Sequence, residues 1–298
     1  MSRILRKEML NMVSLLNKAN RTLKTSLNMK QVNKEGVIQL LADCQDVAVA
    51  MGNEMEMVHR EKTEGVQKVQ EYCSSLYQMS LVLRNPVKRK DVLKDLMEQV
   101  KQLRELIDQE LPDRLEIVFL PYKVSMWESL ESIWAAAKED ENCDVYVVPV
   151  PYYERNEDGS FGSFHYEGEE MPENVSVTHY EHYAVEKHWP DIIYIQNPHD
   201  QDSDEDSVDP RYYSYELKKY TGLLVYVPVC SSGNLDNIEE ISGPACSHVD
   251  YIMIPAEEYR NYFDASLQEG KIRVFDEVSE DDGETYGDRI HQFVSCKC

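Results

Sequence analysis

The sequence predicts an α/β protein in which an N-terminal helical module, residues 1–112, precedes one α/β domain with a parallel sheet, residues 113–298. Two observations support this prediction. Up to residue 111 the apolar residues recur at intervals of three and four, which is the period of amphipathic helices. Beyond Pro112, short β-branched and aromatic runs alternate with helical segments, which is typical of a doubly wound parallel sheet.

The first module contains four predicted helices. Their apolar stripes cover residues 5–27, 37–58, 66–83 and 92–111. The pattern breaks near Gly65 and at Asn85-Pro86, because the residue before a proline avoids the α region. Such stripes are typical of antiparallel helices that bury their own apolar faces, or of a coiled coil. The alternative is a module that forms a homodimer through residues 1–111 or docks onto a partner.

The second module contains seven strand candidates, which are 115–120, 144–149, 175–178, 191–196, 222–227, 250–254 and 272–275. Helical segments are predicted at 126–138, 212–220, 256–265 and 286–294. Asn156 to Ser160 has the composition of a hairpin turn, with a return strand over 161–168. In open α/β sheets ligands bind beyond the carboxyl ends of the strands, so the loops that follow the strands are the candidate sites.

The loop after strand 115–120 carries Tyr122, Lys123, Ser125 and Trp127. Ser125 is a predicted N-cap, with Glu128 three residues later as in a capping box. Free backbone N–H groups at a helix N-terminus attract anions, and Lys123 would add a positive charge. We therefore expect these residues to bind substrate, with plain helix capping as the alternative.

The loop after strand 144–149 and its return strand carry Tyr152, Tyr153, Tyr166 and Glu167. Aromatic faces bury the C–H surface of a sugar or polyol, and carboxylates accept hydrogen bonds from its hydroxyl groups. These four residues are candidates for binding a polyol or sugar phosphate. The alternative is an ordinary solvated hairpin that happens to be rich in tyrosine.

The loop after strand 191–196 reads Gln196-Asn197-Pro198-His199-Asp200 and is the best catalytic candidate. His199 could act as a general base that Asp200 orients, while Gln196 and Asn197 bind substrate. The alternative is a solvated histidine beside an acidic stretch. That stretch, residues 199–209, is rich in aspartate and is predicted to be a solvated loop.

Composition limits the partners. Residues 1–112 hold 18 basic and 15 acidic side chains, whereas residues 113–298 hold 13 basic and 40 acidic ones. A module this acidic repels phosphate backbones, which argues against nucleic acid. No apolar run predicts a transmembrane helix or a signal peptide, so we expect a cytoplasmic protein, with peripheral membrane contact left open. The seven scattered cysteines and the absence of zinc, calcium or nucleotide motifs predict neither a resident metal nor a cofactor.

Several strings carry a family resemblance. They are LLADCQDVAVAMGNEME (40–56), VQEYCSSLY (69–77), LPYKVSMWESLESIWAAAKED (120–140), DVYVVPVPYYERNEDGSFGSFHYEGEEMPENV (144–175) and YYSYELKKYTGLLVYVP (212–228). The chain resembles the CDP-glycerol glycerophosphotransferase-like proteins of teichoic-acid synthesis over most of residues 35–228. The resemblance implies a glycosyltransferase-like architecture with two Rossmann-like halves. The N-terminal half would receive a polyol acceptor, and the C-terminal half would bind the CDP-glycerol donor.

The chain departs from this family in two ways. Relatives tend to read His-Asn-Pro-Tyr-Asp in the third loop, where this chain has Gln196 and His199; glutamine accepts no proton at neutral pH, so the role of base would pass to His199. The 23 residues after the last predicted strand are too few for a second Rossmann-like domain, which needs about 100 residues. We therefore expect the acceptor-side half alone, with weak or no transferase activity. The alternative is a non-catalytic binding or assembly protein.

Overall fold

The computed structural model describes residues 3–29, 31–59, 63–111, 113–201, 203–230, 241–264, 267, 270–275 and 284–298. The chain forms two compact units, Leu5–Asp113 and Arg114–Cys298. Among the described residues, every helix is too short or too polar to span a lipid bilayer.

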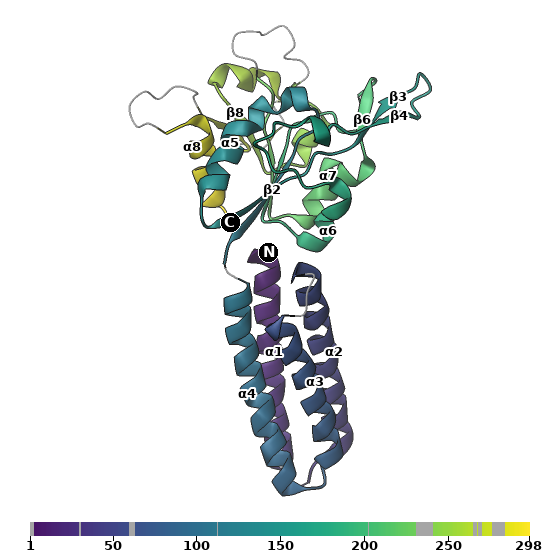
Figure 1. Ribbon diagram of the computed structural model, residues 1–298, viewed down its shortest axis with the longest axis vertical. Helices are drawn as coiled ribbons and strands as arrows, with labels where there is room; N and C mark the ends of the chain where they lie inside the picture. The colour runs from purple at the N-terminus through teal and green to yellow at the C-terminus, as the bar shows by residue number, and fades with distance from the viewer. Residues whose placement is uncertain are drawn as a thin grey trace. The chain divides into compact units, whose positions relative to one another are not determined.

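The first unit is a bundle of antiparallel helices (Figure 1): α1 (Arg3–Leu27), α2 (Lys34–His59), α3 (Glu64–Val82) and α4 (Pro86–Glu110). Thr63 caps α3 by accepting the backbone N–H of Val66. Asn85 caps α4, and Pro86 is its first residue, where the missing N–H costs nothing. The predicted helices and breaks are confirmed.

The apolar stripes of the four helices face one another inside the bundle, where Leu16, Leu76 and Leu103 are at most 1% exposed. The buried polar Asn20 is satisfied there. Its side-chain nitrogen donates to the Leu96 carbonyl (3.2 Å), and its oxygen accepts from the Tyr72 hydroxyl (3.0 Å). The helices thus bury their own stripes, and a homodimer through residues 1–111 stays a prediction.

The second unit is built on a parallel sheet with the strand order β2-β1-β5-β7-β8-β9 (Figure 1). Its strands are β1 (Leu115–Leu120), β2 (Cys143–Val147), β5 (Ile192–Ile195), β7 (Leu223–Tyr226), β8 (Tyr251–Ile254) and β9 (Ile272–Val274). The chain first adds β2 on one side of β1 and then continues on the other side with β5. The parallel Rossmann-like sheet predicted from the alternating pattern is confirmed.

Helices cover both faces of this sheet. On one face α5 (Glu128–Glu139) and α8 (Tyr286–Ser295) pack on the β1 side chains Ile117 and Phe119. On the other face α6 (Val185–His188) and α7 (Ser214–Leu217) pack on Val118 and Leu120. The described 3-10 turns are Val124–Met126, Gly168–Glu170, Tyr180–His182, Pro210–Tyr212, Lys218–Tyr220, Pro244–Ser247 and Glu257–Tyr262.

A small antiparallel sheet projects beside the main one (Figure 1), with the order β4-β3-β6. The predicted hairpin is confirmed as β3 (Tyr152–Arg155) and β4 (Phe161–His165), with Gly159 at φ +79° in the turn. The third strand, β6 (Asp206–Val208), pairs with β3. The prediction that residues 199–209 form a solvated loop was wrong, because Ser207 and Val208 are buried and the segment completes a sheet.

Three further local predictions were wrong. Residues 175–178 form no strand but a single bridge, between Val177 and Val147. The helix expected over 256–265 is, in its described part, the 3-10 turn Glu257–Tyr262. Ser125 lies within the turn Val124–Met126, so it does not cap α5, whose N-cap is Trp127 with no side-chain bond.

Candidate functional site

A cleft lies at the carboxyl ends of β1 and β5, where the strand order reverses. In doubly wound sheets this switch point is the usual ligand site, because the loops on the two strands leave in opposite directions and open a crevice. The cleft has a volume of about 500 Å³. We call it the switch-point cleft; its lining residues are Tyr122, Lys123, Met126, Gln196, Asn197, Pro198, His199, Ser203, Glu205, Asp206, Tyr226, Val229 and Ile241.

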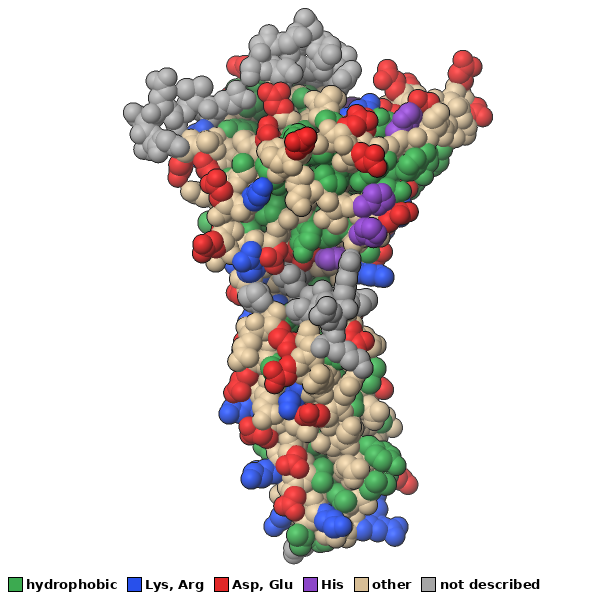
Figure 2. Space-filling view, viewed as in Figure 1, with side chains coloured by type: hydrophobic (Ala, Val, Ile, Leu, Met, Phe, Trp, Pro, Cys, Tyr) green, Lys and Arg blue, Asp and Glu red, His purple; other side chains and the backbone are tan. Residues whose placement is uncertain are grey.

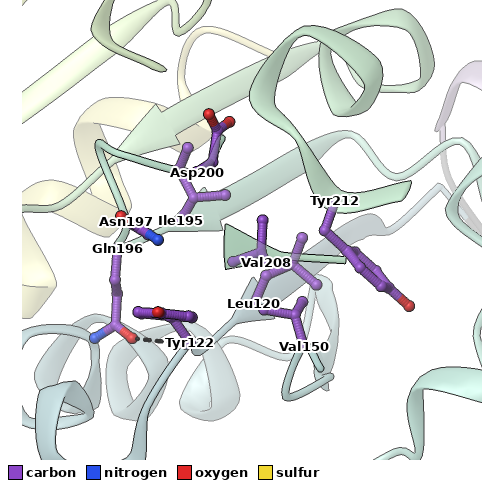
Figure 3. A pocket seen from close by; sticks show the side chains of 9 residues that line it. All are labelled: Leu120, Tyr122, Val150, Ile195, Gln196, Asn197, Asp200, Val208 and Tyr212. Carbon is purple, nitrogen blue, oxygen red and sulfur yellow. Dashed lines mark hydrogen bonds between the residues drawn. The ribbon is translucent and has the colours of Figure 1, made fainter. Parts of the chain in front are cut away.

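Gln196 fixes the floor of the cleft. Its side-chain oxygen accepts the backbone N–H of Tyr122 (3.4 Å), and its nitrogen donates to the Met126 carbonyl and to the Ser129 hydroxyl (2.9 Å). Figure 3 shows the bond to Tyr122. With 1% of Gln196 exposed and both ends of its amide engaged, this residue positions the loop after β1 rather than binding substrate itself.

Lys123 projects from the same loop to the opposite wall. Its ammonium lies 2.7 Å from a carboxylate oxygen of Asp206 on β6, and 5.0 Å and 5.4 Å from the ring centres of Tyr122 and Tyr152. The pKa of the Tyr122 hydroxyl is raised well above its ordinary value, first by burial and then by Asp206. The phenol is therefore neutral, and the positive charge of Lys123 is balanced locally.

Tyr152 and Glu167 connect the small sheet to the loop after β1. The Tyr152 hydroxyl donates to one Glu167 oxygen (2.6 Å), and the backbone N–H of Val124 donates to the other (2.7 Å). Burial and then the Glu167 carboxylate raise the pKa of Tyr152. The Glu167 carboxylate thus accepts a hydrogen bond from a free backbone N–H of the turn after Lys123. We expected such N–H groups to attract the anion of a ligand, and here a carboxylate of the protein itself takes that place.

His199 and Asp200 line different spaces. His199 lines the cleft, and its backbone N–H donates to the Asn197 side chain (2.9 Å). Asp200 instead lines a small neighbouring cavity of about 20 Å³. Its carboxylate accepts the backbone N–H of Ser214 at the start of α7, and Figure 3 shows it turned away from Gln196 and Tyr122.

The structure does not bring every predicted site residue to the cleft. Tyr153 points to the other face of β3, where it packs on Phe161 and Phe164. Tyr166 packs on His179 and Tyr180 instead. Trp127 is 3% exposed in the core beneath α5, and Ser125 is exposed outside the lining.

Sequence reasoning missed the acidic wall of the cleft, formed by Glu205 and Asp206. The signal available was the segment Asp206-Ser207-Val208, in which a β-branched residue follows two short polar ones and suits an edge strand. Its location within an aspartate-rich stretch hid that signal. Tyr226, the last residue of β7, was also missed. It lies near the carboxyl end of a predicted strand, which is where ligand-binding residues are expected.

The lining is suited to hydroxyl groups more than to anions. Asp206, Glu205, Asn197 and His199 can each accept or donate a hydrogen bond, and Tyr122 supplies a ring surface. Among the described lining residues one lysine is present, and it is paired with Asp206. A free phosphate would therefore meet a balanced or negative surface.

No protein-family model matches the chain, and no curated protein or solved structure matches it either. The family resemblance of the sequence strings therefore stays a hypothesis.

Proposed function

We propose that the chain is a glycerophosphotransferase-like protein whose α/β unit holds a polyol acceptor in the switch-point cleft. The observation that carries the proposal is the position and lining of this cleft, at the carboxyl ends of β1 and β5, with acceptor groups on Asp206 and Glu205. Carboxylates accept hydrogen bonds from hydroxyl groups, and the tyrosine rings cover the carbon skeleton.

In the transfer reaction, a polyol hydroxyl oxygen bonds to the glycerol-bearing phosphorus of CDP-glycerol. The bond from that phosphorus to the bridging oxygen breaks, and CMP leaves. His199 is the imidazole in the described lining and is the residue that would take the hydroxyl proton. Asp200 has no part in this proposal, because its carboxylate is directed to Ser214.

The same cleft argues for weak or no turnover by this chain alone. A donor diphosphate needs cationic or backbone N–H partners. Here Asp206 neutralises Lys123, and Glu205 adds a negative charge nearby. The cleft thus supplies the acceptor side of the reaction but not a charge-complementary donor site.

Saturation-transfer NMR with glycerol and ribitol, and calorimetry with CDP-glycerol, test this proposal. We expect polyol signals from the wild type, and affinity reduced by about tenfold in Asp206→Ala, since a hydrogen bond to a charged group contributes about 1.5 kcal/mol. The control is Asp158→Ala, which removes an exposed carboxylate in the hairpin turn. Any CMP release should be lost in His199→Ala and kept in His248→Ala.

Two results would contradict the proposal. One is polyol binding that Asp206→Ala leaves unchanged, which would place the polyol elsewhere. The other is tight capture of CDP-glycerol by the wild type, which would show that a donor site is present.

A second candidate function is docking of the helical bundle onto an anionic membrane surface. Residues 18–38 and 77–94, which form one end of the bundle, hold ten Lys and Arg against two Asp and Glu in a chain of net charge −24. Large apolar side chains are exposed in the same segments, including Met29 (58%), Leu81 (60%) and Val87 (72%). Figure 2 shows basic and apolar side chains together at that end.

A groove of about 520 Å³ between α1 and α4 lies at this basic end, with Lys24, Lys90 and Lys94 in its lining. Basic groups attract the headgroups of anionic lipids, each contributing about 1 kcal/mol near the surface, and exposed apolar side chains insert at the interface. This combination favours a membrane surface over a second copy of the bundle, because the basic ends of two bundles would repel each other.

Sedimentation with lipid vesicles tests the docking function. The protein should bind vesicles containing phosphatidylglycerol and not vesicles of phosphatidylcholine alone, and salt should release it. The double variant Lys90→Glu, Lys94→Glu should lose binding, whereas Lys101→Glu, an exposed lysine farther along α4, should keep it. Equal binding by the double variant would contradict this function.

A further inference from the structure

Three side chains that no motif connects converge in the α/β unit, outside the lining of the switch-point cleft. They are Asp140 at the end of α5, Cys143 at the start of β2 and His291 in α8. One donor atom from each lies within 4.8 Å of the others. His291 Nε2 is 3.1 Å from Asp140 Oδ2 and 4.0 Å from Cys143 Sγ. Cys143 and His291 are 5% and 6% exposed.

Close packing of two helices produces this convergence. Gly287 in α8 lies against the backbone of α5, where a Cβ atom would stand 2.1 Å from the Ser132 carbonyl oxygen. Only glycine allows that approach. Thr285 and Asp288 form a capping box that fixes where α8 begins, and one helical turn after Gly287 places His291 beside the end of α5.

Two of the three donors, Asp140 and His291, are also oriented by neighbouring hydrogen bonds. Asp140 Oδ1 accepts the backbone and side-chain N–H groups of Asn142 (2.8 and 3.0 Å), which leaves Oδ2 directed at His291. On the other side of the ring, His291 Nδ1 lies 3.3 Å from the Ser295 hydroxyl. Metal-binding histidines are oriented by such a bond on the second ring nitrogen, because it fixes the ring and the tautomer.

The geometry distinguishes a metal site from a catalytic relay. In a Cys-His-Asp relay the carboxylate bonds one ring nitrogen and the thiol bonds the other. Here Asp140 and Cys143 both approach Nε2, so that the three groups face one point instead of forming a line. A thiol that is 5% exposed would also reach no substrate.

We propose that Asp140, Cys143 and His291 bind a divalent transition-metal ion, with Zn²⁺ the best match. Zn²⁺ takes sulfur, imidazole and carboxylate donors together in a tetrahedral shell, and water would complete it on the more exposed Asp140 side. Such an ion would join α8 to β2 and α5. Arg114 lies near and donates a hydrogen bond to the Cys143 carbonyl.

Metal titration of the full-length protein under reducing conditions tests the proposal. Calorimetry should show one equivalent of Zn²⁺ bound, and Co²⁺ should give the near-ultraviolet charge-transfer band of a Co–thiolate bond. Cys143→Ser should lose that band, and His291→Gln should lose Zn²⁺ binding. Cys246→Ser and His248→Gln, which change a buried thiol and an imidazole outside the cluster, should retain both.

Circular dichroism of each variant shows whether it has folded, and the Co²⁺ band of the wild type needs no variant at all. A folded wild type that gives no Co–thiolate band would overturn the proposal. So would Zn²⁺ binding of equal affinity in wild type, Cys143→Ser and His291→Gln, because the ion would then be held by surface carboxylates of this acidic unit.

Discussion

At the scale of single residues, Gln196 shows how one neutral side chain shapes the switch-point cleft. It joins the end of β5 to the loop after β1 and to the first turn of α5 through three hydrogen bonds, to Tyr122, Met126 and Ser129. The amide supplies both a donor and an acceptor, which a purely donating or purely accepting group of the same size could not do. The cleft floor therefore depends on residue chemistry that strand patterns do not reveal.

Replacing Gln196 with Leu should destabilise the α/β unit by about 1–3 kcal/mol, because the buried N–H of Tyr122 and the half-buried hydroxyl of Ser129 lose their bonds. Urea denaturation followed by circular dichroism measures this change. Gln292→Leu, at an exposed position in α8, is the control and should change stability by less than about 0.5 kcal/mol. Equal effects of the two substitutions would show that the Gln196 bonds contribute little.

Glu116 gives the protein a stability that depends on pH. It is 1% exposed and accepts the Tyr183 hydroxyl (2.6 Å), with His188 Nδ1 at 2.8 Å. Burial raises the pKa of its carboxyl, but the hydrogen bond to His188 leads the interactions that lower it, with the Tyr183 hydrogen bond among them, and the pKa lies below the ordinary value of 4.5. A carboxyl with a lowered pKa stabilises the fold above its unfolded pKa and loses that contribution as the pH falls.

We therefore expect the free energy of unfolding to decrease as the pH is lowered through 4.5 and below. Glu116→Gln should be less stable than wild type at pH 7 and should lose less stability on acidification. Denaturant titrations across pH 3 to 7 check this, with the exposed Glu128→Gln as control. If the free energy of unfolding of the variant decreased with pH as steeply as that of the wild type, other carboxyl groups would be responsible for the pH dependence.

Residue positions within the site were only partly predictable. The loops were located correctly because strand ends can be read from apolar runs, and Tyr122, Lys123, Asn197 and His199 do line the cleft. Tyr152 and Tyr153 cannot share a face, since neighbours on a strand alternate, and this was deducible. The burial of Trp127 could not be deduced. It depends on the 3-10 turn before α5, because this turn determines which side of the helix faces the core.

At the scale of elements, periodicity predicted the four helices of the bundle and the six strands of the parallel sheet. It failed where tertiary pairing decides the structure. Val175 and Val177 alternate with polar residues like an edge strand, but only Val177 reaches β2. Strand β6 forms by pairing with the edge of β3. A strand of three residues is too short for its apolar pattern to be recognised in the sequence. The close packing of α8 on α5 likewise could not be predicted from the sequence pattern.

That close packing leads to a prediction for Gly287→Ala. The added methyl would overlap the backbone at Ser132, and overpacking of this kind costs about 1–3 kcal/mol. In an ordinary helix the same change is stabilising, because alanine has the higher helix propensity. Urea denaturation decides the sign, and Gln292→Ala on the exposed face of α8 is the control. An increase in stability would show that α8 does not rest on α5 as described.

At the scale of the whole molecule, charge is distributed very unevenly. Residues 113–298 hold 40 acidic against 13 basic side chains, so like charges crowd the surface of the α/β unit. Self-repulsion of this kind destabilises the compact state. The asymmetry was readable from composition, whereas the local pairing of Lys123 with Asp206 was not.

Added salt should therefore raise the Tm of the protein, because screening weakens repulsion among the carboxylates. Most of the gain should come below roughly 0.15 M NaCl, where the Debye length falls to about 8 Å. Differential scanning calorimetry in NaCl measures it, with sucrose as an uncharged co-solute for comparison. A Tm that is constant or falls with NaCl would mean that attractive ion pairs outweigh the excess negative charge.

The pairing of Lys123 with Asp206 joins positions 83 residues apart in the chain. During synthesis, the loop after β1 leaves the ribosome long before β6 exists to face it. An incomplete nascent polypeptide ending before Asp206 consequently has no second wall at the cleft. Any binding of a ligand between the two walls would therefore require that β6 has been synthesised and has paired with β3.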